Sequence, residues 1–132
     1  MSGDDMAGRR ILVVEDETLI AMTIEDALQD LGCVVVGPVA KLDAALLLAR
    51  HEALDAAVLD VTIRGGDVFP VAEQLLARGV PFVLASGYGD WALPKELQNL
   101  PRLTKPFTAQ DLEEQVRSLL ARTTGRTRAS SA

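Results

Sequence analysis

Residues 11–16 read Ile11-Leu12-Val13-Val14-Glu15-Asp16, a short apolar run that ends in two carboxylates. Three other apolar runs also end at a chemically reactive residue, namely Asp60, Ser86 and Lys105. We interpret all four runs as strands of one sheet. Because the ligands of open α/β sheets bind at the C-terminal ends of the strands, the four ends predict a single site. The combination of acids, a hydroxyl and an ammonium indicates phosphoryl chemistry.

Apolar runs alternate along the chain with amphipathic segments, and this alternation predicts βαβ units with a parallel sheet. Strands are expected at residues 10–15, 33–40, 55–60, 81–86 and 102–104. Helices are expected at residues 17–31, 43–51 and 68–78, followed by a last helix that opens at Thr108. This order indicates a flavodoxin-like, doubly wound five-stranded parallel sheet, with strand order 2-1-3-4-5 and flanking helices.

Local signals indicate the helix ends and the buried faces. Gly32 and Gly79 follow the first and third helices, where a glycine commonly ends a helix. Pro70 is compatible with the third helix because it lies in the first turn. The last helix opens with residues that resemble a capping box, Thr108 to Asp111. The third helix is expected to bury Val68, Val71, Ala72, Leu75 and Leu76, and the last helix Leu112, Val116, Leu119 and Leu120.

Residues 87–101 differ from an ordinary crossover between two strands. They hold two glycines together with Pro94 and Pro101, which leave room for about two helical turns. The fourth helix of the fold is therefore expected to be short or irregular. A segment of this kind rearranges easily, so it is the expected moving part of the domain.

Length and composition predict one domain. The chain has 132 residues, of which 48% are hydrophobic, and this is ample for one core. We expect a flexible N-terminus at residues 1–8, the folded domain at residues 9–122 and a disordered tail at residues 123–132. The single cysteine, Cys33, excludes an internal disulfide and is expected to be a small buried residue.

Charge and hydropathy argue against two kinds of partner. The net charge of −6 and the aromatic content of 4% do not favour a nucleic-acid surface. No apolar stretch approaches the ~20 residues that span a bilayer, and the polar start of the chain is not a signal peptide. The expectation is a cytoplasmic protein that binds neither nucleic acid nor membrane.

Glu15, Asp16 and Asp60 are the strongest candidates for a metal site. Three carboxylates at one sheet edge repel one another unless a cation lies between them. A hard divalent ion such as Mg²⁺ prefers these oxygen ligands, and Mn²⁺ is its natural substitute. Helix capping by Asp16 is the structural alternative for the first two acids. Asp60 directly follows a buried apolar run, where an acid needs a partner.

Ser86 and Lys105 are candidates for contacts with a phosphoryl group. Beside an acceptor acid, Ser86 would donate a hydrogen bond to a phosphoryl oxygen and Lys105 would bind the anion. The plainer alternatives are a turn serine and an exposed lysine. A cis bond between Lys105 and Pro106 would direct the lysine into the cleft.

These residues occur in the order and context of the receiver domain of two-component response regulators, which the chain resembles over about residues 9–122. The matching stretches are Ile11–Glu17, Ala57–Val61, Ala85–Gly87 and Thr104–Phe107. Each stretch is a weak signal by itself. Together, in this order, they are highly specific.

The resemblance implies a role for each candidate residue. Asp60 would accept a phosphoryl group from a histidine kinase or a phosphotransfer protein, and Ser86 and Lys105 would bind the phosphoryl oxygens. The ligands of Mg²⁺, some acting through water, would be Glu15, Asp16, Asp60 and Thr62, the last through its backbone carbonyl.

A narrower resemblance covers Pro81 to Gly89, a stretch similar to the Pro-Phe-x-Phe-Ala-Thr-Gly-Tyr motif of a subgroup of mostly stand-alone bacterial receivers. Leu84 and Ser86 replace the second Phe and the Thr of that motif. Many receivers also carry an aromatic residue two positions before the lysine, where this chain has Leu103. Tyr88 is then the nearest candidate for a signalling aromatic, with an exposed loop tyrosine as the alternative.

The sequence therefore predicts a single-domain response regulator, a phosphoacceptor rather than an enzyme, that signals by protein–protein contact. The alternative is an Asp-dependent phosphohydrolase on a related α/β fold. Haloacid dehalogenase-like enzymes place a second acid two residues after the nucleophile, a position that Thr62 occupies here. A receiver-like module that is never phosphorylated is a third reading, which the complete set of site residues disfavours.

Overall fold

The computed structural model describes residues 6–64, 66–87 and 94–131, except for the side chains of residue 96 and of residues 122–131. Its centre is a five-stranded sheet in the order β2-β1-β3-β6-β7, in which all neighbours are parallel. The strands are β1 (Arg10–Val14), β2 (Val34–Val39), β3 (Ala56–Asp60), β6 (Phe82–Ser86) and β7 (Arg102–Thr104). The predicted doubly wound sheet is confirmed, because β6 and β7 are the fourth and fifth strands of this sheet.

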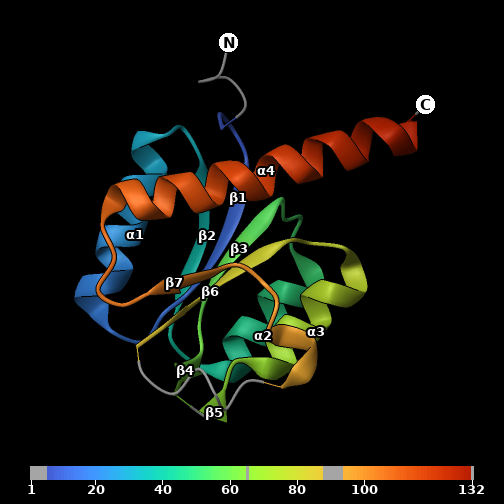
Figure 1. Ribbon diagram of the computed structural model, residues 1–132. Coiled ribbons are helices and arrows are strands. Elements are labelled where there is room, and N and C mark those ends of the chain that lie inside the picture. The colour runs from blue at the N-terminus through green and yellow to red at the C-terminus, as the bar shows by residue number, and fades with distance from the viewer. Residues whose placement is uncertain (1–5, 65, 88–93, 132) are drawn as a thin grey trace.

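Helices cover both faces of the sheet (Figure 1). On one face lie α1 (Thr18–Asp30) and α4 (Ala109–Ser131), and on the other lie α2 (Leu42–His51) and α3 (Phe69–Arg78). The side chains of a strand alternate between the two faces, so each face has its own apolar core. This three-layer arrangement leaves the ends of the strands as the place where polar groups gather.

The central strands are buried on both faces. Every residue of β3 and β6 is buried. Leu59 and Leu84 pack with the α2–α3 layer, whereas Val58 and Val83 pack with the α1–α4 layer. Full burial of one such side chain contributes about 2 kcal/mol. Asp60, the last residue of β3, therefore lies at the end of a fully buried strand.

The predicted helix ends are confirmed. Gly32 has a φ of 90° and Gly79 a φ of 73°, left-handed values that favour glycine directly after a helix. At the start of α4, Thr108 Oγ1 accepts a hydrogen bond from the Asp111 N–H, and Asp111 Oδ2 accepts one from the Thr108 N–H, both at 3.0 Å. The capping box is therefore reciprocal. Cys33 is buried and free, as expected.

The buried faces of α3 and α4 follow the prediction with one exception. Val68, Val71, Ala72 and Leu75 are buried, and so are the four predicted apolar residues of α4. Leu76 was expected to be buried as well, but it is 44% exposed. It directly follows Leu75 and so lies about 100° further round the helix axis, beside the stripe that faces the sheet.

The segment between β3 and α3 contains a hairpin, although none of the expected strands lies in this segment. β4 (Thr62–Ile63) pairs in antiparallel fashion with β5 (Gly66–Asp67). Gly66 has a φ of 137°, which favours glycine. Arg64 forms an isolated bridge with Lys41, so the hairpin is tied to the chain just before α2.

Two further segments bear on the predicted boundaries. In the described part of residues 87–101, the helical element is the short 3₁₀ helix η3 (Lys95–Leu97), which agrees with a short or irregular fourth helix. α4 continues to Ser131, where the sequence predicts a disordered tail from residue 123. No proline after Ala109 obliges the helix to end. The mobility of the tail and the domain boundaries stay predictions.

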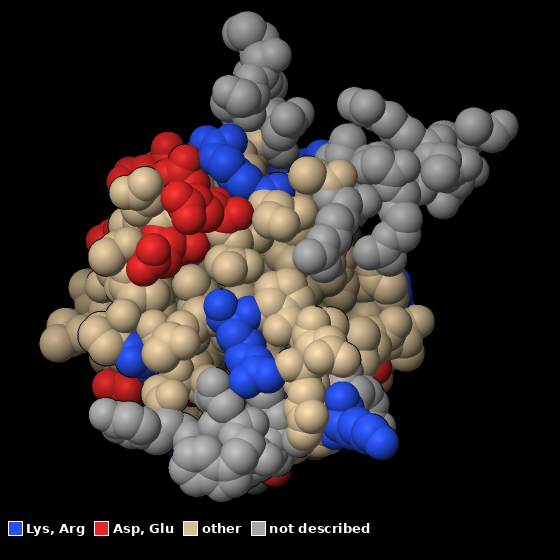
Figure 2. Space-filling model, viewed as in Figure 1, with Lys and Arg blue, Asp and Glu red and all other residues tan. Residues whose placement is uncertain are grey.

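Among the described residues, none of the helices has the length and apolar character needed to cross a membrane. On the face shown in Figure 2, acidic side chains gather over α1 and the start of α4, and basic side chains lie in separate groups. The acidic character of this face agrees with the net charge of −6.

Candidate functional site

The register of the parallel strands brings the predicted site residues to one edge of the sheet. Val14 pairs with Leu59, Asp60 with Ala85, and Ser86 with Thr104. The strands therefore end side by side, and the residues at or after their ends share one open pocket of about 680 Å³. Among its lining residues are Asp16, Glu17, Asp60, Thr62, Ser86 and Lys105.

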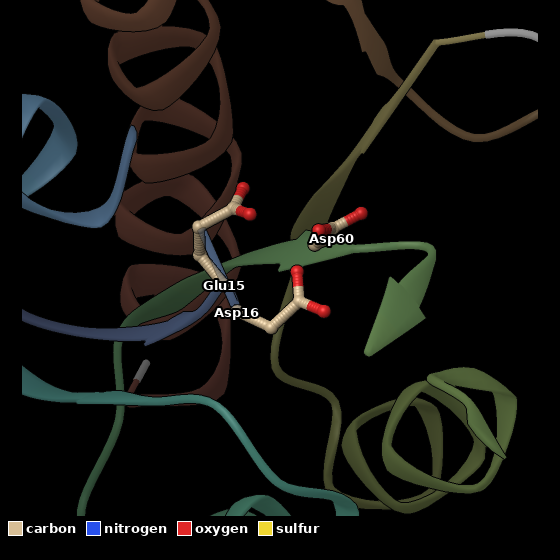
Figure 3. A group of neighbouring side chains, drawn as sticks. All are labelled: Glu15, Asp16 and Asp60. Atoms are coloured by element: carbon tan, nitrogen blue, oxygen red, sulfur yellow. The ribbon is translucent and has the colours of Figure 1, made fainter. Parts of the chain in front are cut away.

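Three carboxylates meet at this edge (Figure 3). Glu15 and Asp16 follow β1 and Asp60 ends β3, and one oxygen of each lies within 4.8 Å of the others. Glu15 is only 2% exposed and Asp60 only 6%. Removing a carboxylate from water costs several kcal/mol unless positive charge compensates it. The edge therefore needs cations.

Lys105 supplies one positive charge. Its Nζ lies 3.1 Å from Asp60 Oδ2, 3.1 Å from Glu15 Oε1 and 3.5 Å from Glu17 Oε1. Burial alone would lower the pKa of Lys105, but the Asp60 and Glu15 carboxylates outweigh burial and raise this pKa. Lys105 is therefore charged at neutral pH, and among the described residues its ammonium contacts two of the three clustered carboxylates, Glu15 and Asp60.

The surroundings of Asp60 change its proton affinity. Burial raises the pKa of Asp60, the hydrogen bond and charge of Glu15 raise it further, and Lys105 opposes both, which leaves the pKa at about 7. Asp60 Oδ1 also accepts a hydrogen bond of 3.2 Å from the Thr62 N–H. A pocket carboxyl with a strongly perturbed pKa is typical of a functional site.

The donor set fits a hard divalent cation. Glu15 Oε1 is buried and has no hydrogen-bond partner among the described residues, although it forms an ion pair with Lys105. The N-cap of α1 is Glu17, and no side chain makes a capping hydrogen bond there, so capping does not account for Asp16. Mg²⁺ prefers oxygen ligands such as carboxylates. Its two positive charges would offset the negative charge of the cluster that Lys105 leaves uncompensated.

Ser86 and Lys105 border the pocket together. Ser86 is 7% exposed, and its carbonyl accepts a hydrogen bond of 2.8 Å from the Lys105 N–H. The Lys105–Pro106 bond is cis, which was raised as a possibility from the sequence. Leu103 is buried in the α1–α4 layer, and Tyr88 lies outside the described residues. The roles of these residues toward a phosphoryl group stay predictions.

Two acids at the pocket have no role in the sequence analysis. Glu17 contacts Lys105, and Asp67 borders the pocket from the β4–β5 hairpin. The run of three consecutive acids after β1 is a signal that could have identified Glu17. Asp67 has no comparable signal, because its position depends on the hairpin.

The fold and the site define a class of protein: a doubly wound α/β domain with an acidic pocket and a lysine at the C-terminal edge of its sheet. The family model described as the response regulator receiver domain matches residues 11–117. The chain belongs to this family. Membership implies two-component signalling, in which the domain is a phosphoacceptor rather than a classic enzyme, and it implies a cognate histidine kinase.

Solved receiver structures resemble nearly the whole domain. SdrG from Sphingomonas melonis Fr1 is 42% identical, with a TM-score of 0.75 and coverage of 87% of this chain and 98% of that chain. The receiver domain of the sensor histidine kinase PA1611 from Pseudomonas aeruginosa PAO1 is 26% identical, with a TM-score of 0.71 and coverage of 87% and 99%. That structure has a magnesium ion coordinated in its active-site cleft.

The curated relatives are longer proteins. The uncharacterized transcriptional regulatory protein YbdJ from Bacillus subtilis is 30% identical over 121 residues, which cover 87% of this chain and 52% of YbdJ. The transcriptional regulatory protein PdtaR from Mycobacterium tuberculosis is 27% identical over 113 residues, which cover 83% of this chain and 55% of PdtaR. The chain therefore spans about half the length of the curated relatives it matches.

Proposed function

We propose that Asp60 is the phosphoacceptor of this receiver domain and takes a phosphoryl group from a histidine kinase or a phosphotransfer protein. One observation carries the proposal: of the three clustered acids, Asp60 alone both lines the pocket and contacts Lys105. Glu15 contacts Lys105 but does not line the pocket, and Asp16 lines the pocket without an ion pair to Lys105. Family membership supports the same assignment.

In the proposed reaction, an oxygen of the ionised Asp60 carboxylate attacks the phosphorus atom in line. A new oxygen–phosphorus bond forms, the bond between phosphorus and the donor nitrogen breaks, and its electron pair leaves with the nitrogen. Lys105 favours the ionised form of Asp60, because its ammonium lies 3.1 Å from Oδ2. The same ammonium can offset negative charge on the phosphoryl oxygens.

The proposed cofactor is Mg²⁺, with Mn²⁺ as a substitute. Glu15, Asp16 and Asp60 would hold it, together with the backbone carbonyl of Thr62 that the family resemblance implies. When bound, the ion would neutralise the clustered carboxylates and polarise the phosphoryl group. The three carboxylates, which each place one oxygen within 4.8 Å of the others, support this assignment.

Ser86 and Lys105 are the residues proposed to bind the phosphoryl group. Ser86 would donate a hydrogen bond to it and Lys105 would form an ion pair with it. The phosphoryl group would thereby favour one of two arrangements of the loops that follow β3 and β6. A partner protein would recognise the changed loop arrangement through direct contact.

We also assign the chain to the subgroup of receivers with the Pro-Phe-x-Phe-Ala-Thr-Gly-Tyr-like motif, most of which stand alone. The stretch from Pro81 to Gly89 supports this assignment. Tyr88 is the proposed signalling aromatic, because Leu103 occupies the position where many receivers carry one.

The test is phosphotransfer from a panel of autophosphorylated histidine kinases of the source organism. The acceptors are the wild-type protein, Asp60→Asn and the control Asp67→Asn. Asp67 lines the same pocket and, among the described residues, makes no ion pair with Lys105. We expect at least one kinase to label the wild type and the control but not Asp60→Asn. Equal labelling of Asp60→Asn, or a wild type that no kinase labels, would contradict the proposal.

A further inference from the structure

Lys105 has a third carboxylate partner that is neither the proposed acceptor nor one of the three clustered acids. Glu17 Oε1 lies 3.5 Å from Lys105 Nζ. We propose that Glu17 is a positioning residue that holds the Lys105 ammonium in the resting pocket and competes with the phosphoryl group for it. This inference rests on the proposed function of the pocket and assigns a new residue to its control.

Glu17 is linked to the site in two separate ways. Its backbone N–H donates a hydrogen bond of 3.1 Å to Glu15 Oε2, and its side chain reaches Lys105. The first link belongs to the backbone and the second to the carboxylate. A substitution that changes only the side chain of Glu17 therefore leaves the support of Glu15 in place.

The three partners of Lys105 differ in depth. The side chains of Glu15 and Asp60 are 1% and 8% exposed, whereas that of Glu17 is 64% exposed. Glu17 also lines the pocket, so its carboxylate lies at the mouth. An ion pair exposed to this degree is weak. Glu17 is therefore the partner that Lys105 can release at least cost when a phosphoryl group arrives.

Glu17 and the phosphoryl group would compete for the Lys105 ammonium, and this competition predicts how a substitution of Glu17 changes the affinity for a phosphoryl analogue. A phosphoryl group, or an analogue bound at Asp60, gains Lys105 only as Glu17 loses it. Removing the Glu17 carboxylate should therefore strengthen binding of the analogue. The expected gain is about two- to fivefold, the range for an exposed ion pair, and it should shrink as salt screens the pair.

The experiment measures the affinity of fluoroberyllate, a phosphoryl analogue, by NMR titration in saturating Mg²⁺. The variants are Glu17→Gln, Glu17→Asp and the control Asp26→Asn, which removes an exposed acid from α1 that has no ion pair among the described residues. Aspartate keeps the charge at the mouth but is one carbon–carbon bond shorter, so it loses its reach to Lys105. Acetyl phosphate labelling of the wild type and Asp60→Asn is run in parallel.

We expect both Glu17 variants to bind fluoroberyllate about two- to fivefold more tightly than the wild type, with Asp26→Asn unchanged. A Glu17→Gln variant that binds no more tightly than Asp26→Asn would overturn the proposal. The proposal would also be overturned if Glu17→Asp bound fluoroberyllate with the wild-type affinity. A negative charge at the mouth of the pocket would then have the same effect without contacting Lys105. Labelling of Asp60→Asn would instead contradict the proposed acceptor, so the two failures are distinguishable.

Discussion

Asp60 Oδ2 and Lys105 Nζ lie 3.1 Å apart, although 45 residues separate them along the chain. The contact joins the end of β3 to the residue after β7, across the intervening strand β6. It therefore forms only when the sheet is complete, and it connects the protonation of the site to the stability of the fold. A change of charge at either residue should alter both properties.

The stability of the metal-free protein is expected to fall as the pH rises from about 5 to about 7. The folded state raises the pKa of Asp60 to about 7, whereas an unfolded aspartate has a pKa of about 4. The folded protein thus holds a proton that the unfolded chain has released. The stabilisation from this group is complete below about pH 4 and is lost as the pH rises through about 7, by roughly 2 kcal/mol between pH 5 and 7.

Urea unfolding in a chelator, at each pH, checks this prediction. Asp60→Asn is the reference because asparagine does not titrate, so its other groups report the background. The stability of the wild type relative to this variant should decrease with pH. A difference that stays constant over the same range would mean that the pKa of Asp60 is not raised.

Replacing Lys105 with Met is expected to destabilise the metal-free protein by about 1–3 kcal/mol. The side chain of Lys105 is 17% exposed and that of its partner Glu15 is 1% exposed, so the variant leaves buried carboxylates without a counter-charge. Lys41→Met is the matched control, since Lys41 is exposed. Urea unfolding at neutral pH gives the comparison, and equal stability of the two variants would contradict the structural role of Lys105.

Asp16→Asn is expected to weaken Mg²⁺ binding about tenfold, because a neutral amide replaces one of three clustered carboxylates. Isothermal titration of Mg²⁺ measures the effect. Asp67→Asn, which changes an acid outside the cluster in the same pocket, should bind Mg²⁺ nearly as the wild type does. Equal losses in both variants would show that only the overall charge of the pocket matters.

Thr108→Ala is expected to cost about 1 kcal/mol of stability, because it removes the hydroxyl that accepts the Asp111 N–H at 3.0 Å. Thr23→Ala is the control: the Thr23 hydroxyl is exposed and bonds to the Leu19 carbonyl inside α1, so its loss should change stability by less than about 0.5 kcal/mol. Chemical denaturation measures both. A cost at Thr108 no larger than that at Thr23 would mean that the capping box adds nothing.

The sheet and its reactive edge were predictable because they follow from short-range patterns. Apolar runs identified the strands, and parallel order then placed the ends of β1, β3, β6 and β7 together. The capping box at Thr108 was equally predictable, because both of its hydrogen bonds join residues that are three positions apart. These predictions needed only local sequence patterns and the rule that the ends of parallel strands share one edge of the sheet.

Features that depend on three-dimensional packing were not predictable in the same way. Leu76 continues an apolar pattern, but its exposure depends on how α3 is rotated against the sheet. The β4–β5 hairpin has too few residues for a strand pattern, so Asp67 was not placed at the pocket. The sequence shows that Glu17 is an acid beside the predicted site. Its contact with Lys105 could not be predicted, because only the fold brings these two residues together.

The measurement that tests the central claim most directly is the intact mass of the protein after incubation with acetyl phosphate and Mg²⁺. The wild type and Asp67→Asn should each gain the mass of one phosphoryl group, and Asp60→Asn should gain none. A phosphoryl group on Asp60→Asn at the wild-type level, or an unmodified wild type, would contradict the assignment of Asp60 as the acceptor.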